Sequence, residues 1–311
     1  MKNIVISEFM NAEPVERLKA KYNVHWDDTL VEKRADLLQA VGEASAIIVR
    51  NKTQVDRELL ESAPNLVVVG RLGVGLDNID MDACAERGVT VCPATGANAP
   101  SVTEYVIGSA FALVRKSFFS TNRIVAGEWP RSELSVGGEL GGRVMGLIGF
   151  GGIGQQVAVN ALGLGMQTIA YDPMLPDDAS AWDKTKRATL DDVISTADII
   201  SLHVPLNSET HGMINSAVLN SMKPGAILIN TARGGIIDEH ALADALRSGH
   251  LGGAAIDVFD DEPASIENMK PFVGLDNVIL TPHIAGLTTE ANVRVSELTV
   301  TNVLKVLEAQ S

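Results

Sequence analysis

Short apolar runs alternate with amphipathic helical patterns along most of this chain. In the first hundred residues, apolar runs predict strands at 3–6, 46–49, 66–69 and 89–92. The segments between them predict helices at 14–20, 31–41, 56–62 and 81–87. Strands that alternate with helices indicate βαβ units and a parallel sheet, so the chain is expected to begin with a small α/β domain.

The next stretch interrupts this alternation. The sequence PATGANAP at 93–100 is rich in turn residues, and a long, mostly apolar helical pattern follows at 101–116. A helix this apolar is expected to be buried on several sides. An irregular segment at 127–142 then carries Trp129, Arg131 and five glycines. Long loops of this kind usually serve a function or an interface.

A second alternating series begins at residue 144 and predicts a doubly wound sheet of six strands. Its expected strands are 144–148, 167–171, 199–203, 226–230, 254–258 and 278–280. Its expected helices are 153–163, 190–195, 215–221 and 239–248. A last amphipathic helix at 288–310 has no strand after it and is expected to return to the first domain. We therefore predict a discontinuous first domain, 1–98 plus 286–311, around a second domain at 99–285.

A glycine-rich turn follows the first strand of the second domain. Gly149, Gly151 and Gly154 have the spacing G-x-G-x-x-G, and the next predicted strand ends at Asp172, 18 residues beyond Gly154. A glycine-rich turn alone could be ordinary, but with the acid it predicts a dinucleotide site. A carboxylate there suits the ribose hydroxyls of NAD and would repel the 2′-phosphate of NADP. The expected cofactor contacts here are Gly149, Gly151, Gly152, Ile153, Gly154 and Asp172.

Composition narrows the classes of partner. The chain has 311 residues and a net charge of −14, without a visible basic cluster, which disfavours nucleic acid and anionic membranes as partners. No apolar run approaches the 18 or more residues of a membrane span, and the N-terminus resembles a strand more than a signal peptide. The two cysteines, Cys84 and Cys92, are too few for a disulfide framework and favour the reducing cytoplasm.

Candidate chemistry lies where the predicted strands end, which is where open α/β sheets bind ligands. Arg233 follows one strand between glycines and can bind a carboxylate with two hydrogen bonds, although a loop arginine at the surface has the same local sequence. Asp257 and Glu262 belong to an acidic run that begins inside a buried strand. Asp257 could accept from a nicotinamide carboxamide, and Glu262 could pair with an imidazole. His283 follows the last strand and is a candidate acid–base, with a structural histidine as the alternative.

Three further loops are candidate binding segments. His203, with Val204 and Pro205, has no acidic partner in its sequence vicinity and is interpreted as part of the cofactor pocket. In the first domain, the segment 71–78 has glycines that can expose N–H groups to an anion, and 50–52 brings Arg50, Asn51 and Lys52 after a strand. Both first-domain segments could equally be polar turns. The histidines and cysteines have no metal-ligand spacing, and no serine or cysteine nucleophile motif is present.

Taken together, these motifs resemble the D-isomer-specific 2-hydroxyacid dehydrogenase family. The matching sequences, in chain order, are RLGVGLDNID, GFGGIG with Tyr171-Asp172-Pro173, HVPLNSET, NTARGG, DVFDDEP and TPHIAG. The resemblance implies an α/β fold of two doubly wound parallel-sheet domains with a cleft between them. The discontinuous domain would be a flavodoxin-like substrate domain, and the other a Rossmann domain that binds NAD.

The resemblance also implies residue roles. His283 matches the catalytic histidine, Glu262 its partner and Arg233 the substrate arginine. The implied substrate contacts are Arg50, Asn51, Arg71, Val74, Gly75, Asn98 and Arg131. The further implied cofactor contacts are His203, Val204, Pro205, Thr210, Thr231, Ala232, Asp257 and Gly286. Gly152 stands where the family often has a basic residue that contacts the pyrophosphate. The family is usually dimeric, and the loop with Trp129 and Arg131 resembles one that reaches toward a partner subunit.

The function expected from this resemblance is NAD-dependent interconversion of a small 2-hydroxy acid and its 2-keto acid. Candidate substrates are sulfolactate, hydroxypyruvate or glyoxylate, and 3-phosphoglycerate. The sequences ISEFM and VRNKT resemble the sulfolactate dehydrogenase branch, and a sulfonate or phosphate would need a cation among Arg50, Lys52, Arg71 and Arg131. The alternative is an NAD-sensing binding protein on the same scaffold, like the transcriptional corepressors of the family.

Overall fold

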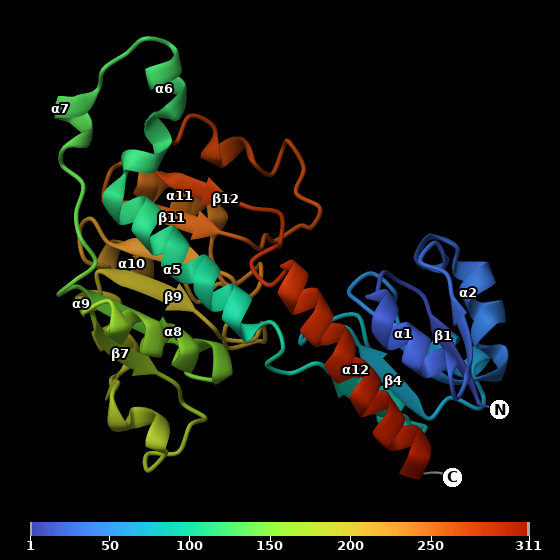
Figure 1. Cartoon of the computed structure of the whole chain (residues 1–311). Coiled ribbons are helices and arrows are strands. Elements are labelled where there is room, and N and C mark those ends of the chain that lie inside the picture. Colours follow the sequence, from blue (N-terminus) through green and yellow to red (C-terminus); the bar gives the residue numbers. More distant parts are fainter. Residues whose placement is uncertain (1, 310–311) are drawn as a thin grey trace. The chain divides into compact units, whose positions relative to one another are not determined.

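The chain forms two compact units in the computed structural model (Figure 1), which describes residues 2–309 apart from the side chains of residues 118 and 119. The first unit is Met1–Asn98 with Leu287–Ser311, and the second is Ala99–Gly286. Gly286 thus belongs to the second unit, one residue away from the boundary expected from the sequence.

The first unit is built on a parallel sheet of five strands in the order β2-β1-β3-β4-β5. Its strands are β1 (Asn3–Ile6), β2 (Asn23–Trp26), β3 (Ala44–Val49), β4 (Val68–Arg71) and β5 (Thr90–Pro93). The sequence predicted four of them and missed β2. This edge strand has no fully buried residue, and its polar positions Asn23 and His25 interrupt the apolar run on which the other predictions rested.

Five α-helices accompany this sheet. They are α1 (Ala12–Lys19), α2 (Arg34–Ala40), α3 (Arg57–Ser62), α4 (Met81–Glu86) and α12 (Thr289–Ala309). The single helix predicted at 31–41 is divided into η1 (Leu30–Glu32), α2 and η2 (Val41–Glu43). The C-terminal helix α12 packs on the sheet, because Val300, Val303 and Leu307 share a buried core with Ile4 and Ile48. Residues 310 and 311 lie outside the described part of the chain, so the last position of the predicted 288–310 helix is not covered.

The second unit has a parallel sheet of seven strands in the order β12-β11-β10-β9-β6-β7-β8. Its strands are β6 (Val144–Ile148), β7 (Gln167–Tyr171), β8 (Lys186–Arg187), β9 (Ile199–Leu202), β10 (Ile227–Asn230), β11 (Gly253–Ile256) and β12 (Val278–Leu280). The prediction of six strands omitted β8, which consists of two exposed basic residues and has no apolar pattern to reveal it. The strand order reverses between β6 and β9, and such a switch point is where open α/β sheets bind ligands.

Helices cover both faces of this sheet. The larger helices are α5 (Ala99–Arg115), α8 (Gly152–Gly163), α9 (Leu190–Thr196), α10 (Ser216–Ser221) and α11 (Glu239–Arg247). Apolar residues of α5 and α8, such as Val106 and Val157, form one buried core with the sheet. Residues of α9, α10 and α11, including Val193, Leu219 and Leu242, form the other. Two short helical turns, η4 (Ser180–Asp183) and η5 (Lys270–Phe272), lie in the connections.

A segment of the second unit extends beyond these layers. It contains η3 (Ser117–Ser120), α6 (Thr121–Val125) and α7 (Arg131–Leu134), and in Figure 1 it runs out from the end of α5 and returns to β6. We call residues 117–142 the arm. The loop predicted at 127–142 is therefore irregular except for the single turn α7.

Helices that could span a membrane and clusters of metal-ligating side chains are both lacking in the described part of the chain. None of the helices within 2–309 is long and apolar enough to cross a membrane. Over the same residues, no group of three or more histidine, cysteine, aspartate or glutamate side chains could hold a metal ion.

Candidate active site

The glycine-rich turn follows β6 and leads into α8. Gly149 has a φ of 89°, and a Cβ atom there would lie 2.5 Å from the carbonyl oxygen of His203. A Cβ atom on Gly154 would lie 2.6 Å from the carbonyl oxygen of Gly149. Both positions therefore require glycine, as a tight strand–turn–helix connection does.

The start of α8 is open to a ligand. Gly151 is the N-cap of this helix and provides no side-chain cap, so its first N–H groups can bind an anion such as a pyrophosphate. A Cβ atom placed at Gly151 or Gly152 would meet no atom within 4 Å. The glycine at position 152, where the family often has a basic residue, is thus not imposed by packing.

Asp172 follows β7 and is bound to the same turn. Its Oδ2 accepts the N–H of Phe150 at 2.7 Å, and its Oδ1 accepts those of Met174 and Leu175 at 2.9 and 3.2 Å. A carboxylate has about four acceptor positions, so one remains for a ribose hydroxyl. Asp172 therefore shapes the glycine turn, a structural role that the sequence did not indicate, and its predicted contact with the ribose of NAD stays a prediction.

Buried polar atoms lie beyond β9 and β10. His203 Nε2 and Thr231 Oγ1 are inaccessible to solvent and have no hydrogen-bond partner among the described residues. Burial lowers the pKa of His203 to about 4, so its ring is neutral at pH 7. Buried polar atoms usually have partners, and these two fit the polar groups of a bound cofactor. The hydroxyl of Thr210, by contrast, donates to Pro205 O at 2.6 Å and so shapes its own loop.

The loops that follow β10, β11 and β12 lie next to one another at one edge of the sheet. Asn230 is paired with Ile256, and Ile256 with Leu280, so the three strands end in register. These loops carry Arg233, Glu262 and His283 respectively, as the sequence predicted from the strand ends.

The Arg233 loop is fixed on both sides. Asn230 is buried at the end of β10; its side chain donates to Arg233 O at 2.9 Å and accepts from Ala232 N at 3.0 Å. Gly235 N donates to Asp260 Oδ1 at 2.6 Å. A Cβ atom at position 234 would lie 1.8 Å from Phe259 O, so the loop and the segment after β11 are in direct backbone contact. Arg233 itself donates from Nη1 to Ala232 O at 2.6 Å.

Glu262 and His283 form a pair. His283 Nδ1 lies 2.7 Å from Glu262 Oε2, and the other oxygen of Glu262 accepts the N–H of Phe259 at 3.0 Å. If Nδ1 donates to the carboxylate, Nε2 is the nitrogen that can take or give a proton. Both side chains are partly exposed, with 46% and 36% of the surface of the His283 and Glu262 side chains accessible, so a substrate can reach them.

Asp257 organises the backbone around His283. Its carboxylate, buried at 1% exposure, accepts the hydroxyl of Thr281 at 2.6 Å and the N–H groups of Ile284 and Ala285, each at 2.8 Å. Its carbonyl oxygen accepts the N–H of His283 at 2.8 Å. His283 has a left-handed φ of 56°, which a non-glycine residue keeps only where its surroundings impose it. The predicted contact of Asp257 with nicotinamide is untested, and three of its acceptor positions already hold this loop.

Thr281 and Tyr105 are site residues that sequence reasoning missed. The hydroxyls of Tyr105, on α5, and Thr281 lie 2.6 Å apart, which connects α5 to Asp257. Burial raises the pKa of Tyr105, so it is a neutral hydroxyl at physiological pH. Thr281 stands in the TPH motif and could have been suspected there. Tyr105 gives no such signal, because it lies in an apolar helical pattern far from the motifs.

Five of the predicted substrate contacts lie at or just after the ends of β3 and β4 in the first unit. Arg50 and Asn51 follow β3, Arg71 is the last residue of β4, and Val74 and Gly75 come after it. The Arg71 side chain turns back onto its own loop and donates from Nη1 to Leu72 O at 2.7 Å. The remaining predicted contacts are on other segments. Asn98 lies before α5, where its Oδ1 is inaccessible to solvent and has no partner within the described chain. Gly286 follows the His283 loop in the second unit and is half-buried.

Arg131 makes no polar contact with the other candidate site residues that are described in its unit. It begins α7 on the arm, is exposed, and makes no hydrogen bond with Arg233, Glu262 or His283 among the described side chains. Its predicted role as a substrate contact stays a prediction.

This combination defines a class of protein: a dinucleotide-binding sheet with a histidine–glutamate pair and an arginine at its carboxyl edge is typical of NAD-dependent dehydrogenases. The family model of the D-isomer specific 2-hydroxyacid dehydrogenase, NAD binding domain, matches residues 107–285. The chain is 51% identical to the (S)-sulfolactate dehydrogenase of Chromohalobacter salexigens over 308 residues, 99% of each chain. It is 39% identical to the hydroxypyruvate reductase of Thermotoga maritima over 302 residues, 97% of each.

A comparison with solved structures supports the same family. The TT0316 protein from Thermus thermophilus superposes with a TM-score of 0.88 at 33% identity, covering 99% of this chain and 97% of that one. The chain belongs to the D-isomer-specific 2-hydroxyacid dehydrogenase family. It is an NAD-dependent oxidoreductase that acts on 2-hydroxy acids, as its sequence predicted, and the two parallel α/β sheets confirm the predicted fold class.

Proposed function

We propose that this enzyme interconverts a small, doubly negative 2-hydroxy acid and its 2-keto acid, with 3-sulfolactate and 3-sulfopyruvate as the preferred pair. The observation that carries this proposal is the 51% identity to an (S)-sulfolactate dehydrogenase over 99% of both chains. Identity at this level, without large gaps in coverage, favours a shared substrate over a shared fold alone.

His283 serves as the acid–base group in the proposed reaction. During oxidation, Nε2 takes the proton of the C2 hydroxyl while hydride leaves C2, and the C–O bond becomes the keto group. NAD supplies the hydride acceptor, and in its reduced form the hydride donor. In the reverse direction, His283 returns the proton to the oxygen. The 2.7 Å contact with Glu262 orients the imidazole so that Nε2 is the exchanging nitrogen.

Arg233 is proposed to hold the substrate carboxylate, which its guanidinium can bind with two parallel hydrogen bonds. Hydrogen bonds from Asn230 and to Asp260 fix the backbone of the Arg233 loop. The point from which the Arg233 side chain extends is therefore defined before the substrate binds. Backbone N–H groups of Val74 and Gly75 and the buried Asn98 side chain are the proposed further contacts. Neither Val74 nor Gly75 donates to another described residue, which leaves both N–H groups for a ligand.

Arg50 is the proposed contact of the second anionic group. This residue is half-buried, and within residues 2–309 no ion pair joins its guanidinium to a carboxylate. A cation withdrawn from water without an acidic partner favours an anionic ligand. Of the other three candidate cations, Lys52 is exposed, Arg71 donates to its own loop and Arg131 lies on the arm, so Arg50 is the one we propose.

A substrate panel tests this proposal. We expect 3-sulfopyruvate to give a kcat/KM about 10–10²-fold above those of pyruvate and glyoxylate, because one extra charged contact contributes about 1.5–3 kcal/mol. The measurement is the steady-state oxidation of NADH with 3-sulfopyruvate, 3-phosphohydroxypyruvate, hydroxypyruvate, glyoxylate and pyruvate. Pyruvate as the best substrate would refute the dianionic specificity. No turnover of any substrate, with NADH still bound, would favour the NAD-sensing alternative.

We also propose that the enzyme is a cytoplasmic homodimer. The arm supports the dimer, because Val125, Trp129 and Val136 are 84%, 78% and 76% exposed, and apolar side chains gathered on one extended segment often mark an interface. The presence of only two cysteines, without a disulfide between them, supports a reducing compartment. We expect sedimentation equilibrium to give twice the mass of the chain, and a monomer at micromolar concentration would contradict the dimer.

A further inference from the structure

Glu8 is a buried acidic residue that the proposed reaction does not use. It lies just after β1, with 5% of its surface exposed. Its carboxylate accepts the N–H groups of Arg50 at 2.8 Å, Lys52 at 3.2 Å and Thr53 at 3.0 Å. A carboxylate removed from water needs several donors, and here three backbone N–H groups of one loop supply them. Glu8 thus stabilises the loop 50–53 by accepting hydrogen bonds from its backbone N–H groups.

Other side chains bind the backbone carbonyl oxygens of the same loop. The side chain of Asn78 donates to Arg50 O at 3.3 Å and to Thr53 O at 2.7 Å. The hydroxyls of Ser7 and Thr53 lie 2.9 Å apart. The loop has no regular secondary structure, so these side-chain contacts, and not a sheet or helix, determine its conformation.

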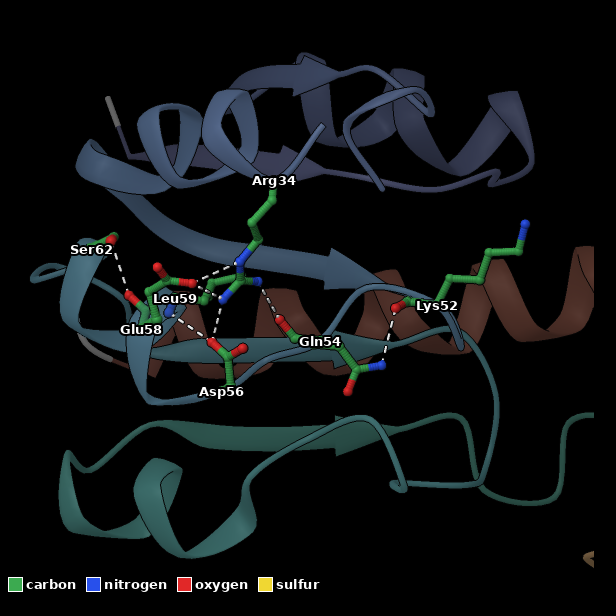
Figure 2. A network of polar contacts seen from close by, with 7 residues as sticks. All are labelled: Arg34, Lys52, Gln54, Asp56, Glu58, Leu59 and Ser62. Carbon is green, nitrogen blue, oxygen red and sulfur yellow. Dashed lines mark hydrogen bonds and ion pairs between the residues drawn. The ribbon is translucent and has the colours of Figure 1, made fainter. Parts of the chain in front are cut away.

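A second network fixes the chain just beyond this loop. Figure 2 shows Arg34 bonded to Gln54 O at 2.9 Å and to the carboxylates of Asp56 and Glu58, while Gln54 donates to Lys52 O at 3.2 Å. In the same view the Lys52 side chain extends away from the network. The loop is therefore anchored at both ends, and of its two basic side chains Lys52 is exposed whereas Arg50 is half-buried.

The guanidinium of Arg50 is held by two further groups. Its Nη2 donates to Asn292 Oδ1, on α12, at 2.9 Å, and its Cζ lies 6.0 Å from the centre of the Phe9 ring. Burial lowers the pKa of Arg50, and the charge of the Glu8 carboxylate offsets part of that effect. Glu8 therefore fixes the backbone of Arg50 and favours its charge, without approaching the guanidinium closely enough to neutralise it.

We infer that Glu8 and Asn292 are positioning residues for Arg50 and thereby determine the preference for doubly negative substrates. Glu8 fixes where the Arg50 side chain starts, and Asn292 fixes where its guanidinium ends. Substrates that carry only the carboxylate do not need this cation, because Arg233, Val74 and Gly75 bind that group. The inference rests on the proposed function, in which Arg50 contacts the second anionic group.

The test replaces Glu8 by glutamine and Asn292 by alanine and compares 3-sulfopyruvate with pyruvate. Glutamine keeps the size of glutamate but presents an NH₂ group to N–H donors, so the loop loses at least one charge-assisted hydrogen bond. We expect the KM for 3-sulfopyruvate to rise about 10–100-fold in Glu8→Gln, with kcat and the KM for pyruvate within about twofold of wild type. Asn292→Ala should show the same selective change, to a smaller extent. Glu61→Gln, an exposed glutamate of α3, is the matched control and should change neither KM.

The outcomes separate the inference from the proposed function. A wild-type enzyme that does not prefer 3-sulfopyruvate overturns both. A wild type with that preference, whose two variants change both substrates equally or neither, overturns only the inference and leaves Glu8 a purely structural residue. If Glu8→Gln does not fold, judged by its circular dichroism and melting temperature, Asn292→Ala decides alone, because it leaves the buried carboxylate untouched.

Discussion

Turnover of every accepted 2-keto acid is expected to fall by about 10²–10⁴-fold when His283 is replaced by alanine, the range that general acid–base catalysis contributes. The reason is that Nε2 of His283 is the group proposed to deliver the proton to the keto oxygen. Binding of NADH should stay within about twofold of wild type, because the glycine turn and Asp172 lie on other strands. Single-turnover kinetics and fluorescence titration with NADH measure the two effects separately.

A second variant is needed because the backbone of His283 has a left-handed conformation. Alanine at a φ of 56° introduces strain that could disturb the loop by itself, whereas asparagine tolerates this left-handed conformation. His283→Asn should therefore lose as much activity as His283→Ala while it keeps the wild-type melting temperature. The exposed His240 on α11 provides the control, His240→Ala, which should be fully active. Near wild-type turnover in His283→Asn would contradict the assignment of the acid–base group.

The sequence was sufficient to predict which edge of the sheet carries these residues. Each of β10, β11 and β12 is an apolar run that is followed directly by a polar residue. Parallel strands end at a common edge, so the sequence alone places Arg233, Glu262 and His283 together. The pairing of Glu262 with an imidazole was also accessible, since an acid and a histidine on neighbouring strand ends are within reach of each other. The 2.7 Å contact between them agrees with that expectation.

What the sequence could not predict are the contacts that hold the loops. Glu8 bonds to residues 42 to 45 positions later, and no periodicity links an acid after one strand to N–H groups after another. Tyr105 is similar, because its pattern is that of a buried helix and only the fold brings its hydroxyl to Thr281. Edge strands fail for a related reason. β2 and β8 bury too little apolar surface to leave a pattern, so propensity and burial give no signal there.

Asp257 illustrates how a motif can be recognised and its role still be underestimated. Its place in an acidic run at a buried strand suggested a ligand contact, which stays a prediction, and its carboxylate also binds Thr281, Ile284 and Ala285. Each of these bonds restrains the segment that keeps His283 in a left-handed conformation. A site of this kind depends on support from buried neighbours, which hold the reacting side chain within the small tolerance that catalysis needs.

Replacing Arg233 by alanine is expected to lower kcat/KM by about 10²–10³-fold for 3-sulfopyruvate and for pyruvate alike. Removing one partner of a charge-assisted, desolvated contact costs about 2–5 kcal/mol, and the carboxylate is common to both substrates. This uniform loss distinguishes Arg233 from Glu8 and Asn292, whose variants should affect the dianion alone. Arg233→Lys should recover only part of the activity, because an ammonium keeps the charge without the planar fork that binds both carboxylate oxygens. Steady-state kinetics with both substrates at saturating NADH provide the measurement.

Chemical rescue separates the lost guanidinium from a damaged loop. The Arg233 backbone is held by Asn230, and Gly235 by Asp260, through groups that the substitution leaves in place, so the vacated position should still admit a small cation. Added guanidinium is expected to raise the activity of Arg233→Ala in a saturable manner and to leave wild type unchanged. The exposed Arg247 of α11 supplies the control, Arg247→Ala, which should keep wild-type kinetics and show no rescue. A variant at position 233 that retains wild-type kcat/KM for both substrates would show that the carboxylate is bound elsewhere.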